Sequence, residues 1–117
     1  MAAYRLSSTL LDDAWGDAQL LRRNGLTGSI ASQLYQSASS IAANIAEGYS
    51  RGSGRDRVRL FEYALGSARE CRVWYRAGRH VLGQAICNAR IAALDQICRI
   101  LLTAIPKERT RTIRRVK

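Results

Sequence analysis

Apolar residues recur at steps of three and four along the chain, a spacing that places them on one face of an α-helix. The first such stretch predicts a helix over residues 7–23, with Ser7 or Ser8 as its N-cap. Asn24-Gly25 follows as a stop signal, because glycine readily adopts the left-handed conformation that ends a helix. The predicted buried stripe of this helix comprises Leu10, Leu11, Ala14, Trp15, Ala18 and Leu21.

A second helix is predicted to begin between Thr27 and Ser29 and to end at Gly48. Its apolar positions are Ile30, Leu34, Ala38, Ile41 and Ile45. The second half of the helix reads SASSIAANIA, and such small side chains let another backbone approach closely at little cost in side-chain entropy. We therefore expect a tightly packed neighbouring helix at this position.

A third helix is predicted to begin at Asp56, a suitable N-cap after the flexible stretch GSG, and to continue to about Gly78 or beyond. Its core face comprises Phe61, Ala64, Leu65, Ala68, Cys71 and Tyr75.

The fourth predicted helix, residues 84–103, carries two overlapping apolar stripes. One comprises Ile86, Ala93, Ile97 and Leu101, and the other comprises Cys87, Ile91, Leu94, Cys98, Leu102 and Ile105. Together they form an arc wider than the roughly 100° that one core requires. We therefore expect a second buried contact, through association of the bundle with copies of itself.

Four helices joined by short connections predict an all-α fold, an up-down-up-down four-helix bundle. The composition agrees, because the apolar residues are mostly Ala, Leu and Ile, and the only proline is Pro106. A chain of 117 residues has the size of one domain, and we assign residues 1–105 to the bundle. Residues 106–117, PKERTRTIRRVK, have too little apolar content for a core and are interpreted as a basic C-terminal arm.

The formal net charge of +10 arises from 19 Lys and Arg against 9 Asp and Glu, and most of the excess lies in residues 51–82 and 106–117. Such a field attracts polyanions, so nucleic acid or an acidic protein surface is the expected class of partner. A general preference for arginine, combined with a need for solubility, is the alternative explanation.

Three groups of cations are the candidate contacts to the backbone of RNA or DNA. Arg51, Arg55, Arg57 and Arg59 flank the start of the third helix, where backbone N–H groups favour anions. Arg69, Arg72, Arg76 and Arg79 follow at spacings that form one ridge along the same helix. The arm adds Lys107, Arg109, Arg111, Arg114, Arg115 and Lys117.

Each group also has a structural interpretation. The loop arginines could be solvated or could pair with carboxylates of a neighbouring subunit. The ridge could pair within the bundle or between subunits, with Asp12, Asp13, Asp17 or Glu47 as partners. The arm could be a solubility tail, and it lacks the interleaved aromatic residues that typically stack on single strands.

The sequence contains no recognisable set of catalytic residues. His80 is the only histidine and has no partner at a spacing that suggests a triad. The glycines after residue 47 lack the GxxxxGK[ST] pattern of a nucleotide-binding loop, and the segment is interpreted as a helix connection. We expect a protein that is not an enzyme and that uses no cofactor or metal.

The cysteines and the hydropathy define the expected compartment. Cys71, Cys87 and Cys98 lie on apolar helical patterns without CxxC spacing, which favours buried reduced thiols over a disulfide framework or a zinc site. No apolar run approaches the length of a membrane span, and the N-terminus lacks the apolar region of a signal peptide. We expect a cytoplasmic protein with no membrane partner.

Three segments together resemble the bacterial 23S rRNA-intervening sequence protein family. They read GLTGSI from Gly25, SIAANIAEGYSR from Ser40 and ALGSARE from Ala64, and the resemblance extends over about residues 5–105. Ala42 stands where family members carry a proline, which restores a backbone donor to the second helix. The resemblance implies a four-helix bundle that assembles as a closed homo-oligomer, a pentamer.

The family is also distantly similar to the accessory variability determinant of diversity-generating retroelements, a basic pentamer that binds nucleic acid and a reverse transcriptase. The resulting hypothesis is a non-catalytic homo-oligomer that binds RNA or DNA through arginine-rich surfaces. The alternative is a structural or adaptor oligomer that binds a protein client and uses its arginines in subunit contacts.

Overall fold

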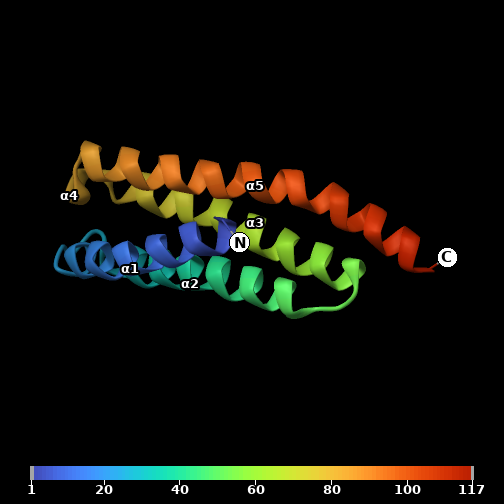
Figure 1. Ribbon diagram of the computed structural model, residues 1–117. Coiled ribbons are helices and arrows are strands. Elements are labelled where there is room, and N and C mark those ends of the chain that lie inside the picture. The colour runs from blue at the N-terminus through green and yellow to red at the C-terminus, as the bar shows by residue number, and fades with distance from the viewer. Residues whose placement is uncertain (1, 117) are drawn as a thin grey trace.

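The protein is a bundle of four long helices with one short helix at a corner (Figure 1). The computed structural model describes residues 2–116, with side chains described through residue 111. In chain order the helices are α1 (Ala2–Arg22), α2 (Gly28–Ser50), α3 (Gly54–Ala77), α4 (Arg79–Leu82) and α5 (Gln84–Val116). The predicted all-α fold is confirmed for the described residues.

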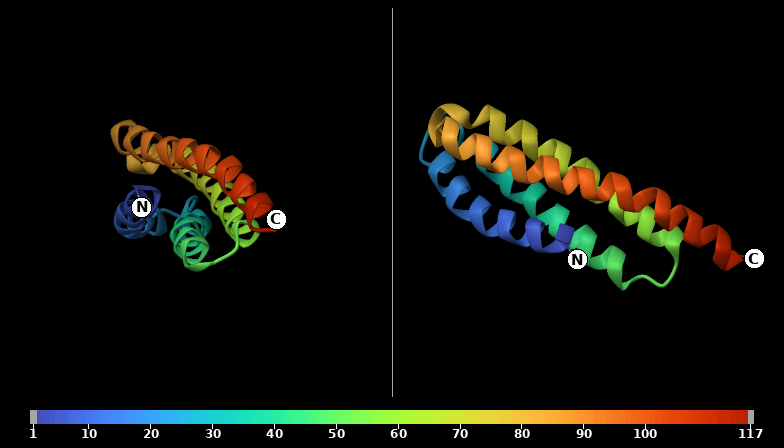
Figure 2. Two further views of the ribbon diagram at one scale, coloured as in Figure 1. Left: turned by 45° about the vertical axis from the view of Figure 1, so that its right-hand side comes forward. Right: turned by 45° about the horizontal axis from the view of Figure 1, so that its top comes forward.

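Each long helix runs antiparallel to the one before it, as the up-down-up-down prediction requires (Figure 2). Helix α2 packs between α1 and α3, and α5 packs between α3 and α1. The sides formed by α1–α2 and by α3–α5 therefore lie opposite each other. The bundle measures 56 × 20 × 18 Å along its principal axes, and α5 extends well beyond the N-terminal end of α1.

The core follows the predicted apolar stripes closely. The large side chains that are fully buried include Leu10, Leu21, Leu34, Ile41, Ile45, Phe61, Tyr75, Leu94, Ile97 and Leu101. The prediction that Trp15 is buried is wrong, because its side chain is 56% exposed. Trp15 lies at the outer edge of the α1–α2 pair, where its ring meets Tyr35 instead of the core.

Most of the wide apolar arc of α5 is used within the chain itself. Cys87, Leu94, Ile97, Cys98, Leu101 and Ile105 are buried, and Ile86, Ile91 and Ala93 are half-buried. Leu102 remains 49% exposed. Because α5 packs against both α3 and α1, two intramolecular contacts explain most of the width of the arc, and self-association stays a prediction.

Four predicted helix boundaries are wrong. Helix α1 begins at Ala2, five residues before the expected start, and the hydroxyl of Ser7 donates to the carbonyl of Tyr4 (2.8 Å) inside the helix instead of capping it. Helix α2 ends at Ser50, two residues after Gly48, and α3 begins at Gly54, two residues before Asp56. The fourth error is the largest, because α5 does not end near residue 103.

Helix α5 continues to Val116 and contains Pro106. Proline removes one backbone donor, but the helix beyond it is held against α3 by the ion pairs Arg57–Glu108 (3.4 Å) and Arg109–Glu62 (3.6 Å). The first described residues of the predicted basic arm are therefore a continuation of α5, with no break at the expected boundary.

The small residues of α2 produce the tightly packed neighbour that the sequence predicts, and the neighbour is α3. A Cβ atom placed on Gly48 would lie 2.6 Å from Cε1 of Phe61. Nearby, the hydroxyls of Ser40 and Ser67 are 2.8 Å apart, and the amide of Asn44 donates to the carbonyl of Ser40 (2.8 Å). The segment SIAANIAEG thus joins α2 to α3, and α2 is an unbroken helix through Ala42.

Gly48→Ala is expected to lower the free energy of unfolding by about 1–3 kcal/mol, because the buried Phe61 ring has no room to move away from a new methyl group. Gly66→Ala is the matched control, because a Cβ atom there meets nothing within 4 Å. That change should stabilise α3 by up to about 1 kcal/mol. Urea unfolding followed by circular dichroism measures both, and an equal effect of the two changes would contradict the close packing at Gly48.

Candidate nucleic-acid interface

The arginines at the start of α3 are mostly paired with carboxylates. Arg51 pairs with Glu47 (2.7 Å) on α2, and Arg59 pairs with Asp56 (3.7 Å) one turn earlier on α3. Arg55 is exposed and forms no ion pair with any described carboxylate. This group therefore offers less free positive charge than its sequence suggests.

Arg57 has a structural position. Its Nε donates to the carbonyl of Arg51 (2.9 Å), its Nη2 donates to the carbonyl of Tyr49 (3.2 Å), and its Nη1 pairs with Glu108 (3.4 Å). Only 18% of the side chain is exposed. Arg57 thus ties the α2–α3 connection to α5, and most of its donors are occupied within the chain.

The predicted ridge is divided between two helices. Arg69, Arg72 and Arg76 lie on α3, whereas Arg79 lies on α4, beyond the break at Gly78. Arg79 Nη1 donates to the carbonyl of Arg76 (2.8 Å), which keeps the two residues together across the break. The ridge is therefore continuous in space although the helix is not.

Arg72 is the paired member of the ridge. Its Nη1 donates to Oδ1 of Asp95 on α5 (2.7 Å), and this bond raises the pKa of Arg72. Asp95 is not among the four carboxylates that were predicted as partners of the ridge. Arg69 and Arg76 are exposed and have no ion pair within the described part of the chain.

Helix α5 adds an exposed cation that sequence reasoning missed. Arg99 lies one turn beyond Asp95, on the same side of α5. Burial raises the pKa of the nearby Cys98 thiol, and the positive charges of Arg72, Arg69 and Arg99 oppose that rise. We define the α3–α5 band as Arg69, Arg72, Arg76, Arg79 and Arg99.

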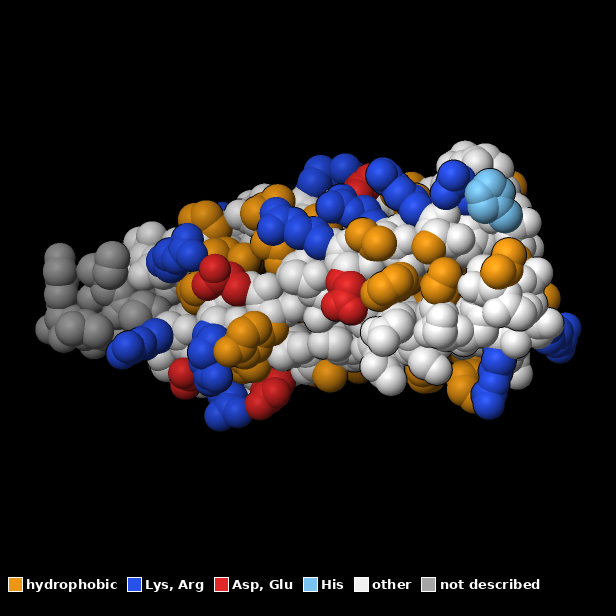
Figure 3. All heavy atoms as spheres, turned by 180° about the vertical axis from the view of Figure 1, so that it is seen from behind, with side chains coloured by type: hydrophobic (Ala, Val, Ile, Leu, Met, Phe, Trp, Pro, Cys, Tyr) orange, Lys and Arg blue, Asp and Glu red, His pale blue; other side chains and the backbone are white. Residues whose placement is uncertain are grey.

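The band lies on one side of the bundle. Figure 3 shows Lys and Arg side chains gathered in a row along the upper edge of the molecule, with hydrophobic side chains beside them. Asp95 is the carboxylate that contacts the band, so positive charge is in excess there. The four-residue spacing of Asp95 and Arg99 indicates that they share one side of α5. The local sequence does not indicate which helix that side faces.

The described cations of the predicted arm are largely paired. Arg109 contacts Glu62 (3.6 Å), and Arg111 contacts Glu108 (3.4 Å). Lys107 is exposed and has no ion pair among residues 2–111. The predicted contacts Arg114, Arg115 and Lys117 lie outside the residues whose side chains are described.

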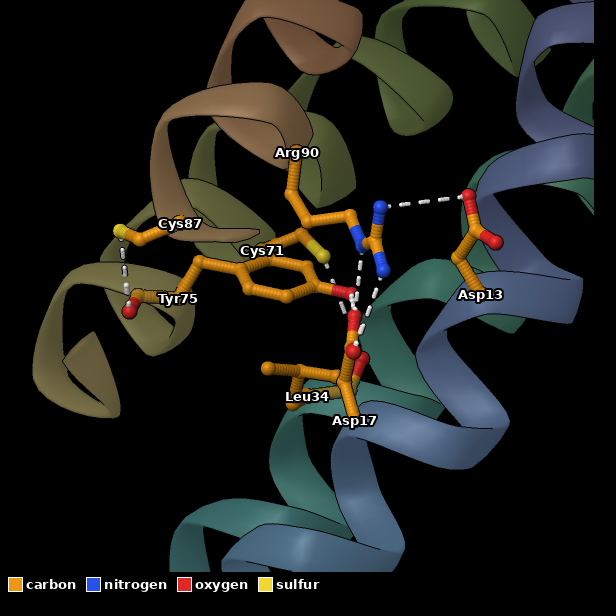
Figure 4. A network of polar contacts seen from close by, with 7 residues as sticks. All are labelled: Asp13, Asp17, Leu34, Cys71, Tyr75, Cys87 and Arg90. Atoms are coloured by element: carbon orange, nitrogen blue, oxygen red, sulfur yellow. Dashed lines mark hydrogen bonds and ion pairs between the residues drawn. The ribbon is translucent and has the colours of Figure 1, made fainter. Parts of the chain in front are cut away.

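A buried polar network crosses the bundle (Figure 4). The carboxylate of Asp17, 5% exposed, accepts hydrogen bonds from Tyr75 Oη (2.7 Å) and from Arg90 Nε (2.7 Å) and Nη2 (3.3 Å). Arg90 Nη1 also contacts Oδ2 of Asp13 (3.5 Å). Asp13 and Asp17, two of the predicted partners of the ridge, pair with Arg90 of α5 instead.

The buried polar atoms of the network bond to one another. Burial and the bond to Asp17 raise the pKa of Tyr75, and the same carboxylate raises the pKa of Arg90. Every buried side-chain N or O atom in the described residues has a hydrogen-bond partner. The network therefore joins α1 to α3 and α5 as a structural element.

The three cysteines are buried free thiols, as predicted. Cys71 donates to the carbonyl of Leu34 (4.0 Å), and burial raises the pKa of its thiol to about 11. Cys87 donates to the carbonyl of Tyr75 (3.5 Å).

No cluster of His, Cys, Asp and Glu that could hold a metal occurs in the described residues. None of the helices in the described chain has the length and hydropathy of a membrane span.

The antiparallel bundle, with its small-residue contact between α2 and α3, defines the class as a helical-bundle protein with a cationic side. The chain belongs to the 23S rRNA-intervening sequence protein family, whose model matches residues 4–103. The signature segments that indicated this family lie at the α1–α2 turn and at the α2–α3 contact, so their role here is to maintain the fold.

The fold is also similar to a solved structure. A protein of unknown function from the S23 ribosomal protein family of Bacteroides thetaiotaomicron VPI-5482 superimposes with a TM-score of 0.81 at 19% identity. The match covers 88% of this chain and 97% of that protein. A comparison with curated proteins gave no match.

Proposed function

We propose that the protein is a non-catalytic homo-oligomeric bundle that binds the backbone of RNA or DNA through the α3–α5 band. The observation that supports this is the contrast between the two ends of α3. Near the α2–α3 connection, only Arg55 of the four arginines lacks a carboxylate partner among the described residues. In the band, Arg69, Arg76 and Arg99 all lack one.

Unpaired like charges on adjacent turns repel one another, so the band is most stable when an anion lies across it. A nucleic-acid backbone supplies a row of phosphates, and each guanidinium can bind phosphate with two parallel hydrogen bonds. The pair of Arg72 with Asp95 fixes one cation of the row in place. Contacts of this kind recognise the backbone and do not distinguish one base sequence from another.

The family's name connects its members with an intervening sequence of 23S rRNA, which favours RNA as the polyanion to test first. The expected assembly is a closed ring, a pentamer, in which copies of the band would present a continuous cationic surface.

A second candidate function has an observation in its favour. Val73, 57% exposed, lies between Arg69 and Arg76 on α3, and Leu102, 49% exposed, lies one turn beyond Arg99 on α5. Exposed apolar residues among cations are typical of protein interfaces. The alternative is therefore an adaptor oligomer whose band contacts another subunit or an acidic protein client.

Arg69→Glu combined with Arg76→Glu tests the proposal. The wild-type protein, with about four phosphate contacts, should lose roughly 100-fold in affinity for structured RNA between 50 and 200 mM salt in filter binding. The double variant should bind about 10-fold or more weakly at the lower salt and show a shallower salt dependence. Light scattering should give the same oligomer for both proteins.

The matched control is Arg55→Glu combined with Arg59→Glu, which makes the same change in net charge at the other end of α3. A smaller loss in this control would locate binding at the band. An equal loss would show that only total charge matters and would contradict the proposed interface. Dissociation of the Arg69 and Arg76 variant would favour the adaptor function instead.

A further inference from the structure

The side of the bundle opposite the α3–α5 band contains a groove between α1 and α2. Its volume is about 300 Å³, and its lining includes Trp15, Gln19 and Arg22 from α1 and Ser32, Tyr35 and Gln36 from α2. No acidic residue lines the groove. It therefore combines an aromatic surface, neutral hydrogen-bonding groups and one positive charge.

Trp15 presents a flat apolar surface to solvent. Its ring centroid lies 5.4 Å from that of Tyr35, with an angle of 69° between the ring planes. In this edge arrangement Tyr35 can cover at most one face of the indole. Because Tyr35 is itself packed against the core, it supports the indole while leaving a face open, and 56% of Trp15 remains exposed.

Arg22 lies on the same face of α1, two turns beyond Trp15 and about 10 Å along the helix axis. It has no ion pair with any carboxylate of the described chain. Gln19 lies between the two residues and can donate and accept hydrogen bonds. An open aromatic face next to an unpaired guanidinium is the arrangement that binds a base and a phosphate of one strand.

We infer that this groove binds an unpaired nucleotide, with its base stacked on Trp15 and a backbone phosphate bonded by Arg22. The inference depends on the proposed nucleic-acid binding and adds single-stranded segments to the substrate class. A second copy of the chain is a poorer occupant, because each copy carries a net charge of +10 and the groove offers no carboxylate to receive another cation.

Tryptophan fluorescence tests the inference directly. Trp74→Phe removes the second of the two tryptophans, so that Trp15 becomes the reporter. A single-stranded oligouridine RNA of about eight nucleotides should quench its emission. A duplex RNA of equal length should bind through the band without quenching, because its bases remain stacked within the helix.

Variants in the groove supply the second measurement. Trp15→Ala should weaken binding of the single strand by roughly five- to 100-fold and leave duplex binding unchanged. Tyr63→Ala is the matched control, because Tyr63 is 54% exposed on α3 and lies outside the groove. Arg22→Gln should weaken single-strand binding more than Arg23→Gln, the adjacent exposed arginine.

Each remaining outcome is decisive. If duplex RNA binds but the single strand neither quenches Trp15 nor depends on it, the inference fails and the proposed function stands. If neither RNA binds, the proposed function fails and the inference with it. If Trp15→Ala instead dissociates the oligomer, the groove is a subunit contact and the inference is overturned.

Discussion

Asp17→Ala should lower the free energy of unfolding by about 3–5 kcal/mol, the largest effect we expect from a single substitution. The change removes the acceptor of three hydrogen bonds and leaves the hydroxyl of Tyr75 and most of the Arg90 guanidinium buried without a partner. Asp13 contacts only Nη1 of Arg90, at 3.5 Å, and cannot replace Asp17. Urea unfolding followed by circular dichroism measures the loss.

Asp12→Ala is the control for this prediction, because Asp12 is an exposed carboxylate on the same helix. It should change the free energy of unfolding by no more than about 0.5 kcal/mol. The loss in the free energy of unfolding for Tyr75→Phe should lie between those for Asp17→Ala and Asp12→Ala, at about 1–3 kcal/mol, because Asp17 keeps its bonds to Arg90. A loss below 1 kcal/mol for Asp17→Ala would mean that the network does not hold α1 in place.

Arg57→Ala is expected to cost about 2–4 kcal/mol of stability, the second-largest effect. The change removes the donors to the carbonyls of Tyr49 and Arg51 and separates Glu108 of α5 from the α2–α3 connection. Thermal unfolding followed by circular dichroism, at several urea concentrations, gives the free energy.

Arg55→Ala is the matched variant, because it removes the same charge two residues away, at an exposed position without an ion pair among residues 2–111. It should leave stability within about 0.5 kcal/mol of wild type. Similar stabilities for the two variants would contradict the structural role of Arg57. The comparison also prevents a loss of RNA binding caused by partial unfolding from being mistaken for a lost phosphate contact.

The helices and the core were predictable because their signals are local. A period of three to four residues identifies a buried face without knowledge of the partner, and it correctly selected Leu10, Phe61 and Leu94. Trp15 had the correct period but lies at the edge of the α1–α2 pair. Periodicity does not distinguish the centre of a buried face from its margin.

The ends of the helices were less predictable because distant residues determine them. Burial of Ala3 in the core stabilises the first turns of α1, which carry no capping signal. The helix beyond Pro106 is stabilised by Arg57, 51 residues from Glu108 in the sequence. No inspection of the segment PKERTRTIRRVK could reveal that contact.

The candidate site shows the same division. The sequence located the arginines, but whether each one is free depends on carboxylates of other helices, as for Arg72 and Asp95. Arg99 joins the band because α5 packs beside α3, and the assignment required the fold. The charge pattern therefore predicted the class of partner. The packing of α5 beside α3 was needed to define the proposed binding surface.

Two exposed ion pairs lie at the end of the bundle away from the enclosed Asp17 network. Where α5 extends past α1, the ion pair Arg109–Glu62 joins α5 to α3, and the pair Arg51–Glu47 lies at the C-terminal end of α2; both are about half exposed. At the other end, the apolar core surrounds the enclosed Asp17 carboxylate. Dissolved ions screen exposed pairs far more than enclosed ones. We therefore expect added salt to weaken the exposed pairs where α5 extends past α1 and to leave the enclosed Asp17 network nearly unchanged.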